Sequence, residues 1–452
     1  MAPEVSRDLI AELGSLVGPA HVLVDPDATL GQRSDWSGRW VAPPAAIVVR
    51  PADTAEVRAV VLCCGLAGVP VVAQGGNSGL AGGATPTGAA VVMSTVRLDS
   101  IGPIGPDGQI CVGAGATLAS TQAAARAGAL RVAVDLGSRD VATIGGMVAT
   151  NASGLRAARL GPMRRWVTGL EVVLADGTLL DRMDGLSKDA TGYDLLGLLC
   201  GSEGTLGVVT GVRLQLLGVP EQVCAAWVTF DNLGSAITAA CSWFAAIPDV
   251  EAVELLDDRS LALVSGGAGR AGTGTGAPGQ AAVLVEACGR SGVDTLLAAA
   301  IEGSAGVLHT EVAVDAPGLA RLWARRDAVP LAIRAAGVPV KGDVAVPVDR
   351  IEELIAEVRS LAGHVVCFGH VVDGNIHVNV LGVGSAGRDE VEHGILRVAA
   401  SLGGTISAEH GVGRAKVSML GWRRTEAELA AFAAIKRAFD PDGLLNPGVI
   451  VP

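Results

Sequence analysis

Short apolar runs alternate with amphipathic segments along most of the chain. The apolar runs at 45–51 and 69–76 predict strands, and the segment between them, 54–68, has the apolar spacing of a helix. An Asp-Gly pair between two apolar runs at 170–180 predicts a β-hairpin. Residues 1–40 predict a helical lead-in, because apolar side chains near the N-terminus recur at the spacing of one helix face.

The pattern changes near Pro220, where a second α/β module begins. It predicts strands at 223–230 and 250–257 and a helix at 233–246. The low-complexity stretch 265–280 predicts a loop. The residues after about Ser385 are largely helical in pattern. We therefore expect an α+β protein with a lead-in at 1–40, domains at 41–218 and 219–385, and a helical C-terminal segment at 386–452.

Composition excludes several classes of protein. The 452 residues are 50% hydrophobic, which is too apolar for a mainly disordered chain. The net charge of −12 and an aromatic content of 3% argue against binding to nucleic acid. No apolar run approaches the roughly 20 residues of a membrane span, and the N-terminal residues lack a secretory pattern. The 8 cysteines include no C-x-x-C pair, so we expect buried thiols in a cytoplasmic protein, with peripheral association at the inner membrane as an alternative.

A glycine-rich loop, Gln74–Gly79, begins inside the run predicted as a strand at 69–76. Successive glycines let backbone N–H groups converge on an anion, and Asn77 and Ser78 add side-chain donors. The loop is neither a Walker loop nor a G-x-G-x-x-G loop. Taken alone, it fits a phosphate site or a purely structural turn. Two further polar, glycine-rich stretches follow at 134–161 and 201–214, and long polar loops are often functional.

These three stretches, in this order, resemble the FAD-binding domain of the vanillyl-alcohol-oxidase/PCMH fold, in its FAD-linked 2-hydroxyacid dehydrogenase and oxidase branch. The resemblance extends from about Pro43 to Ile450 and implies a PCMH-type FAD-binding domain with an α/β substrate (cap) domain. Relatives that attach FAD covalently use a histidine in the first loop, where this chain has Asn77, so the resemblance implies non-covalent FAD. The FAD-binding residues that it implies are Gln74, Gly75, Gly76, Asn77, Ser78, Gly79, Ser138, Thr143, Gly146, Asn151, Ser153, Gly154, Glu203, Gly204, Val208 and Asn446. Within this set, Glu203, Gly204 and Val208 are expected to face the adenine half of FAD.

Two histidines flank an Asp-Gly pair in the segment 365–382. If Asp373-Gly374 forms the hairpin turn, His370 pairs with His377; if the turn is one residue later, His370 opposes Asn379. Either register leaves both imidazoles on one face of the sheet, with Asn379 beside them. They could be two buried core histidines, but a shared metal ion would satisfy both.

Glu409 in the segment 407–416 is a candidate third metal ligand. Two histidines and a carboxylate leave coordination positions open, as a catalytic metal site requires. The branch named above carries the same motifs, H-x-x-x-G-N-x-H and E-H-G, which strengthens the assignment of His370, His377 and Glu409 as ligands. We expect Zn²⁺, with Mn²⁺ or Co²⁺ as alternatives. The neighbouring His410 is a candidate general base, since a neutral imidazole accepts a hydroxyl proton near pH 7.

The resemblance also implies a clamp for the substrate carboxylate. Spacing from Trp323 favours Arg326 as its arginine, with Arg325 as the alternative, and Lys341 as its lysine. Arginine suits this role because its planar fork binds a carboxylate through two hydrogen bonds. Hydroxyglutarate enzymes of the branch tend to carry a hydroxyl side chain four residues after the arginine, whereas this chain has Pro330.

Together these features predict an FAD-dependent, metal-assisted oxidation of a D-2-hydroxy acid to the 2-keto acid, with hydride transfer to flavin N5. The expected substrates are D-2-hydroxyglutarate, D-lactate or glycolate. The expected electron acceptor is a quinone, an electron-transfer flavoprotein or a cytochrome, and a homodimer is compatible with the sequence. The alternatives are another flavoenzyme of the fold, such as an alcohol oxidase or an alkyl-glycerone-phosphate synthase-like transferase, and a binding protein that has lost activity.

Overall fold

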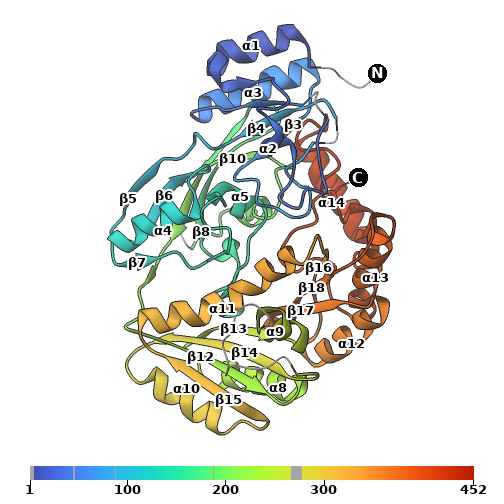
Figure 1. Cartoon of the computed structure of the whole chain (residues 1–452). Coiled ribbons are helices and arrows are strands. Elements are labelled where there is room, and N and C mark those ends of the chain that lie inside the picture. Colours follow the sequence, from blue (N-terminus) through green and yellow to red (C-terminus); the bar gives the residue numbers. More distant parts are fainter. Residues whose placement is uncertain (1–4, 44–45, 87, 187, 266–276, 452) are drawn as a thin grey trace. The chain divides into compact units, whose positions relative to one another are not determined.

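The computed structural model describes residues 5–43, 46–86, 88–186, 188–265 and 277–451 (Figure 1). The chain divides into two compact units. The first contains residues 1–154, 162–219 and 409–452, and the second contains residues 155–161 and 220–408. The segment 386–408, which we grouped with the C-terminus, lies in the second unit. Most of the low-complexity stretch, 266–276, lies outside the described residues.

The first unit contains a four-stranded and a five-stranded sheet. The four-stranded sheet has the order β1 (Val22–Leu23), β2 (Ile47–Val49), β4 (Val91–Ser94), β3 (Val71–Gln74), and its last three strands are parallel. The five-stranded sheet is antiparallel, in the order β5 (Ile101–Ile104), β6 (Gln109–Gly113), β10 (Val208–Gln215), β8 (Val167–Val173), β9 (Leu179–Arg182). A short pair joins β7 (Leu130–Arg131) and β11 (Leu217–Gly218).

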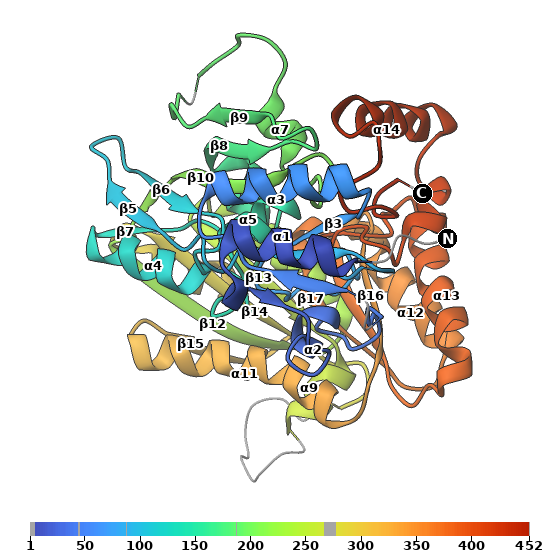
Figure 2. The same ribbon diagram turned by 90° about the horizontal axis from the view of Figure 1, so that it is seen from above.

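Helices of the first unit surround these sheets. Helices α1 and α3 run side by side (Figure 2). Helix α3 begins where the Asp53 side chain accepts the N–H of Glu56 (2.9 Å) and ends at Gly68, which takes the left-handed conformation. The helices are α1 (Arg7–Val17), η1 (Pro19–His21), α2 (Leu30–Arg33), α3 (Thr54–Ala67), α4 (Leu118–Ala127), α5 (Ile144–Ala149), η2 (Met163–Arg165), α7 (Leu195–Leu199), η6 (Val417–Trp422) and α14 (Glu426–Phe439).

The second unit is built on one seven-stranded antiparallel sheet. Its order is β15 (Val307–Ala313), β12 (Gln222–Phe230), β14 (Ala281–Gly289), β13 (Val250–Leu256), β17 (Val365–His370), β18 (Asn375–Val380), β16 (Val340–Ala345). The helices are α6 (Ala157–Leu160), α8 (Leu233–Ala246), α9 (Asp258–Ser265), α10 (Val293–Glu302), α11 (Ala316–Ala335), η3 (Val348–Arg350), α12 (Ile351–Leu361), η4 (Val371–Asp373), η5 (Ser385–Gly387) and α13 (Arg388–Ser401).

Helix α11 crosses one face of this sheet, and α8 and α10 cover the other (Figure 1). A core cluster between α11 and the sheet includes the buried side chains of Trp227, Leu284 and Phe368. On the opposite face Trp243 of α8 packs against Phe230. Strands β12, β13 and β14 therefore bury side chains on both of their faces, which explains why they read as continuous apolar runs rather than as alternating patterns.

The strand–helix–strand elements predicted in each of the two modules are confirmed: β2, α3 and β3 in the first, and β12, α8 and β13 in the second. The predicted hairpin at 170–180 is also confirmed, since β8 and β9 pair and Gly177 takes a positive φ in the turn between them. In the described part of the chain, no helix is both long and apolar enough to cross a membrane.

Candidate active site

A pocket in the first unit is lined by the three polar, glycine-rich stretches of the sequence and by His410. Parallel strands β3 and β4 end at the same edge of their sheet, so the loop after Gln74 and the residue after Ser94 meet there. A side chain at Gly76 would place its Cβ 1.6 Å from the Val141 carbonyl oxygen. Only glycine therefore allows the first loop to pack against the second.

The structure places ten of the predicted FAD-binding residues in the pocket wall: Gln74, Gly75, Gly76, Asn77, Ser78, Gly79, Thr143, Gly146, Glu203 and Gly204. The other six are not among the residues that line it: Ser138, Asn151, Ser153, Gly154, Val208 and Asn446. Two of them support nearby loops: Asn446 donates to the carbonyl oxygens of Gly83 and Glu203, at 2.7 Å each. Asn151 accepts the N–H of Arg164 at 2.9 Å.

Sequence reasoning missed several lining residues. Thr95 follows β4, and the parallel pairing of β3 with β4 was the signal that could have revealed it. Met147, Ala149 and Ala152 line the pocket from the second stretch. Such apolar residues carry no motif of their own, although flat apolar walls are typical of cofactor sites.

Glu203 connects two loops of this pocket. Its two carboxylate oxygens accept the N–H groups of Val412 and Gly413, at 2.8 Å each. Burial raises the pKa of Glu203 above its ordinary value, and the two N–H donors and Lys416 oppose that rise. The contacts fix the segment that directly follows His410, so Glu203 helps to hold His410 at the pocket.

The histidine hairpin of the second unit has a different register from either predicted one. His370 pairs with Asn375, and His377 pairs with Phe368, so both predicted registers are wrong. The reason is a longer connection: residues 371–373 form a 3₁₀ turn, and Gly374 has a φ of +77°. Gly374 cannot carry a side chain there, because a Cβ would lie 1.9 Å from the Val346 carbonyl oxygen.

The prediction that both histidines share a face of the sheet is confirmed, and Asn379 lies on that face two residues after His377. The ring centroids of His370 and His377 are 5.3 Å apart, and their planes cross at 85°. Pairing of β16 with β18 adds Lys341 opposite Asn379 and Asp343 opposite His377. The face thus gathers imidazole, amide, ammonium and carboxylate groups on three neighbouring strands.

Each histidine has a buried carboxylate near its Nδ1 atom. Glu254 Oε1 lies 2.5 Å from His370 Nδ1, and Asp343 Oδ1 lies 3.5 Å from His377 Nδ1. Asn375 donates to the same oxygen of Asp343 at 2.9 Å. Burial alone would raise the pKa of Glu254, but the positive charges of His370 and Arg326 hold it well below its ordinary value of 4.5.

The two candidate arginines lie at different places on the sheet. Arg326 is buried and binds Glu254 Oε2 through Nε (2.8 Å) and Nη2 (2.7 Å). Arg325 instead binds Glu311 at 2.8 Å and lies over the Trp227 ring, 4.9 Å from its centroid. Glu311 is on β15, at the opposite edge of the sheet from the histidine hairpin. Of the two, only Arg326 shares a partner with a histidine.

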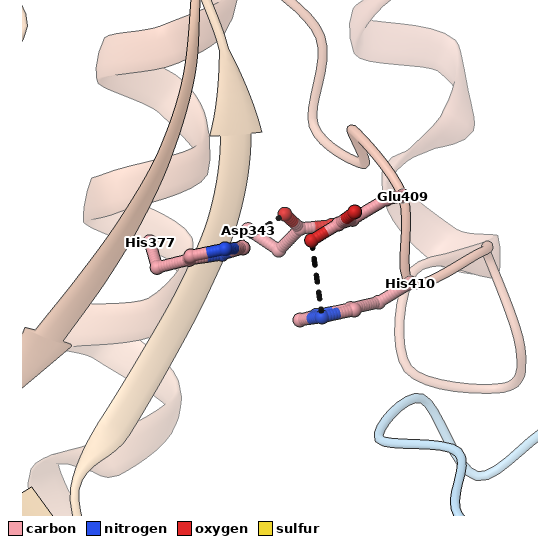
Figure 3. Close-up of side chains that lie close together, drawn as sticks. All are labelled: Asp343, His377, Glu409 and His410. Carbon is pink, nitrogen blue, oxygen red and sulfur yellow. Dashed lines mark ion pairs between the residues drawn. The ribbon is translucent and has the colours of Figure 1, made fainter. Parts of the chain in front are cut away.

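Glu409 and His410 open the last segment of the first unit, and His410 Nε2 lies 3.9 Å from Glu409 Oε1. Figure 3 shows this pair, and also His377 and Asp343 on their neighbouring strands. Ala408, the residue before Glu409, donates its N–H to the Asp343 carbonyl oxygen at 3.3 Å.

Two family models match the chain. The FAD binding domain matches residues 45–182, and the C-terminal domain of FAD linked oxidases matches residues 219–450. The chain belongs to the FAD-linked oxidase family. This FAD-linked oxidase is 33% identical over 464 residues to the mitochondrial D-2-hydroxyglutarate dehydrogenase of Bos taurus, covering 99% of the chain and 84% of the relative. It is 36% identical over 440 residues to the D-2-hydroxyglutarate dehydrogenase of Xanthomonas citri pv. viticola, covering 92% and 90%.

Solved structures confirm the expected fold of this FAD-linked oxidase. p-Cresol methylhydroxylase with substrate bound aligns with a TM-score of 0.78 at 16% identity, covering 98% of the chain and 96% of that structure. Alkyldihydroxyacetonephosphate synthase aligns with a TM-score of 0.77 at 16% identity, covering 98% and 86%. At such identities the likeness concerns the fold alone. The predicted FAD cofactor and oxidoreductase class are confirmed by the family.

Proposed function

We propose that this FAD-linked oxidase oxidises a D-2-hydroxy acid to the 2-keto acid with the help of a divalent metal ion. The names of its relatives favour D-2-hydroxyglutarate as the substrate over D-lactate and glycolate. The observation that carries the proposal is the polar face of the seven-stranded sheet, where His370, His377, Asn379 and Lys341 come together. An anionic hydroxy acid needs such a combination of cationic and metal-binding groups.

The proposed metal ligands are His370, His377 and Glu409. Because Nδ1 of each histidine faces a carboxylate, both imidazoles would bind the ion through Nε2. Glu409 follows Ala408 in the chain, and Ala408 is bonded to the strand that carries Asp343, so the chain itself keeps Glu409 within reach. The donor set suits Zn²⁺ best and also accommodates Mn²⁺ or Co²⁺.

Besides His377 and Glu409, the side chains of Asp343 and His410 offer ligand atoms, whereas His370 is not in that group, so Asp343 is a further candidate ligand. No sequence motif identifies Asp343 as a ligand. Asp343 lies opposite His377 because strand β16 pairs with strand β18.

A metal ion held by His370, His377 and Glu409 would lower the pKa of the substrate 2-hydroxyl, and FAD would serve as the acceptor of the C2 hydride, at N5. Arg326 and Lys341 are proposed to bind the C1 carboxylate, and Asn379 to orient the hydroxyl group beside Lys341. His410, which lines the flavin pocket, is proposed to take the hydroxyl proton as a neutral imidazole. The C2 hydride and the hydroxyl proton leave together, so the organic product is the 2-keto acid.

FAD is proposed to be non-covalent, since Asn77 stands in the first loop and its amide is engaged by the protein itself. The Asn77 side chain donates to the carbonyl oxygens of Gly31 (2.9 Å) and Ser34 (2.6 Å). The reduced flavin needs an external acceptor, for which a quinone, an electron-transfer flavoprotein or a cytochrome is proposed. Cytoplasmic location and homodimerisation stay predictions.

Anaerobic reduction of the flavin tests the proposal. The purified holoprotein is mixed in turn with D-2-hydroxyglutarate, D-lactate, glycolate and D-malate, before and after treatment with EDTA. We expect D-2-hydroxyglutarate to bleach the flavin absorbance fastest, EDTA to slow bleaching at least tenfold, and Zn²⁺ or Mn²⁺ to restore it. L-2-hydroxyglutarate serves as the control for stereochemistry. A flavin that no D-acid bleaches would refute the proposed function and favour the transferase or alcohol-oxidase alternatives.

Two histidine variants distinguish loss of the metal ion from general effects of mutation. His377→Ala should abolish rapid bleaching, whereas His364→Ala, an exposed histidine just before β17, should bleach at the wild-type rate. Unchanged bleaching by His377→Ala would refute the metal assignment. The flavin spectrum of each variant shows whether the cofactor pocket is intact.

A further inference from the structure

Glu254 sits behind the proposed metal site rather than in it. Its side chain is 1% exposed, and it pairs directly with His370 across strands β13 and β17. One carboxylate oxygen lies 2.5 Å from His370 Nδ1. The other oxygen accepts a hydrogen bond from Arg326 Nε at 2.8 Å and forms an ion pair with Arg326 Nη2 at 2.7 Å. One buried carboxylate therefore contacts both a proposed metal ligand and the proposed carboxylate-binding arginine.

We propose that Glu254 is a positioning residue that fixes His370 for the metal ion and Arg326 for the substrate at the same time. This inference rests on the proposed function, because it takes His370 as a ligand. A carboxylate that accepts the Nδ1–H of histidine sets the tautomer that presents Nε2 to a metal ion and fixes the plane of the ring. The same carboxylate holds the guanidinium of Arg326 in one orientation through a two-point contact.

The location on a central strand makes this arrangement rigid. Strands β13 and β17 are interior strands of the seven-stranded sheet, and the pairing of Glu254 with His370 is set by backbone hydrogen bonds rather than by a loop. Phe368, two residues before His370, packs under the Arg326 guanidinium, which lies 5.2 Å from the ring centroid. Displacing Glu254 would therefore remove a carboxylate partner from both Arg326 and His370.

A second buried carboxylate on the adjacent strand provides a matched control. Glu286 of β14 is 3% exposed, and it binds Arg156 at 2.6 Å and the Trp323 indole N–H at 2.6 Å. It thus resembles Glu254 in burial and in its arginine partner, but in the described part of the chain its side-chain partners are Arg156, Trp323 and Cys288 rather than a histidine. Glu286→Gln should reproduce the structural cost of neutralising a buried carboxylate without a specific effect on the metal ion.

The test measures metal affinity in the FAD-loaded protein, by competition between Zn²⁺ and a chelator of known affinity. Removing the outer partner of a metal-ligating histidine costs typically about 10–100-fold in affinity. We expect Glu254→Gln to weaken Zn²⁺ binding by about that factor. It should also raise KM for the hydroxy acid through Arg326. Glu286→Gln should keep the Zn²⁺ affinity within about threefold of wild type. A threefold change corresponds to less than half of the binding free energy that a tenfold change represents.

Cobalt spectroscopy separates positioning from direct ligation. With Co²⁺ in place of Zn²⁺, Glu254→Gln should shift the visible bands only slightly, because the set of ligands is unchanged. His377→Ala should change their intensity strongly, because a ligand is lost. A large intensity change in Glu254→Gln would show that Glu254 ligates the ion and would overturn the positioning role.

The possible failures are distinguishable. If the wild-type protein binds neither Zn²⁺ nor Co²⁺, the proposed metal function fails and this inference falls with it. If the wild type binds metal and Glu254→Gln binds it equally well, the inference alone is refuted. Should Glu254→Gln fail to fold, Glu254→Asp retains the charge but shortens the reach, and it should weaken Zn²⁺ binding too. If neither variant folds, the nitrogen NMR shifts of wild-type His370 decide: an Nε2–H tautomer in the metal-free protein would overturn the inference.

Discussion

Gly76→Ala should disrupt FAD binding although it adds only one methyl group. In the structure a Cβ at Gly76 would lie 1.6 Å from the Val141 carbonyl oxygen and 2.5 Å from its carbonyl carbon. Contacts of a Cβ below 3.0 Å are essentially never seen, so the two loops would have to separate by more than 1 Å. Both partners are backbone, so rotation of a side chain cannot relieve the overlap.

The magnitude follows from this geometry. Overpacking a well-packed site typically costs about 1–3 kcal/mol even where side chains can adjust. Because adjustment here must separate the loops that line the pocket, we expect a cost of about 3 kcal/mol, divided between stability and cofactor binding. If most of that cost falls on binding, the Kd for FAD rises by about 100-fold, since each tenfold change corresponds to about 1.4 kcal/mol.

Apoprotein is titrated with FAD, and flavin fluorescence reports the Kd, while urea unfolding of the apoprotein reports stability. Gly137→Ala is the matched control, because a Cβ at that exposed loop glycine would meet nothing within 4 Å. It should bind FAD as the wild type does. Wild-type affinity and wild-type stability in Gly76→Ala would show that the two loops are not in the described contact, and the reasoning would be wrong.

Three further predictions follow from the same contacts. Arg326→Met should lower kcat/KM for the hydroxy acid by about 100-fold, in line with the about 2–5 kcal/mol that truncation of a buried charge pair costs. Arg325→Met should leave kcat/KM within about threefold of wild type, a change of under about 1 kcal/mol. Steady-state kinetics of both variants test this, and a larger loss in Arg325→Met than in Arg326→Met would contradict it. The pKa of Glu254 is lowered in the folded protein, so its carboxylate contributes stability that is present above pH 4.5 and is lost as the pH falls below that value. Urea unfolding between pH 5.5 and 3.5 should therefore show a steeper loss in the wild type than in Glu254→Gln, and equal slopes would refute the assignment. Precipitation with trichloroacetic acid should leave a colourless pellet and a yellow supernatant, and colour retained on the protein would show a covalent flavin.

Much of the fold was predictable because its signals are local. The hairpin at β8–β9 was found from its Asp-Gly turn, and β12, α8 and β13 from the length and spacing of their apolar runs. The loop Gln74–Gly79 was recognised as a candidate pocket loop because its glycines stand close together in the sequence, and the structure places it in a pocket wall. These features are determined by residues that are close together in the chain, so they can be recognised from the sequence alone.

The remaining features depend on contacts between distant segments. The register of the histidine hairpin was mispredicted because its connection is longer than a two-residue turn: residues 371–373 form a 3₁₀ turn, and Gly374 packs against the Val346 carbonyl oxygen of another segment. Glu254 was missed because it stands 116 positions from His370 in the chain and carries no motif of its own. Thr95 was missed because it enters the pocket only through the parallel pairing of β3 with β4. Tertiary pairing, not local pattern, decides each of these.

The first unit is discontinuous, and its segment 409–452 is synthesised after the second unit. That segment supplies His410 to the pocket wall and pairs with β3 through hydrogen bonds from Val71 to Leu444 and from Asn446 to Val71. The residues of the second unit have all left the ribosome before this segment emerges. During translation the sheet with the histidine hairpin can therefore form first, and the pocket that His410 lines is complete only after residues 409–452 have emerged.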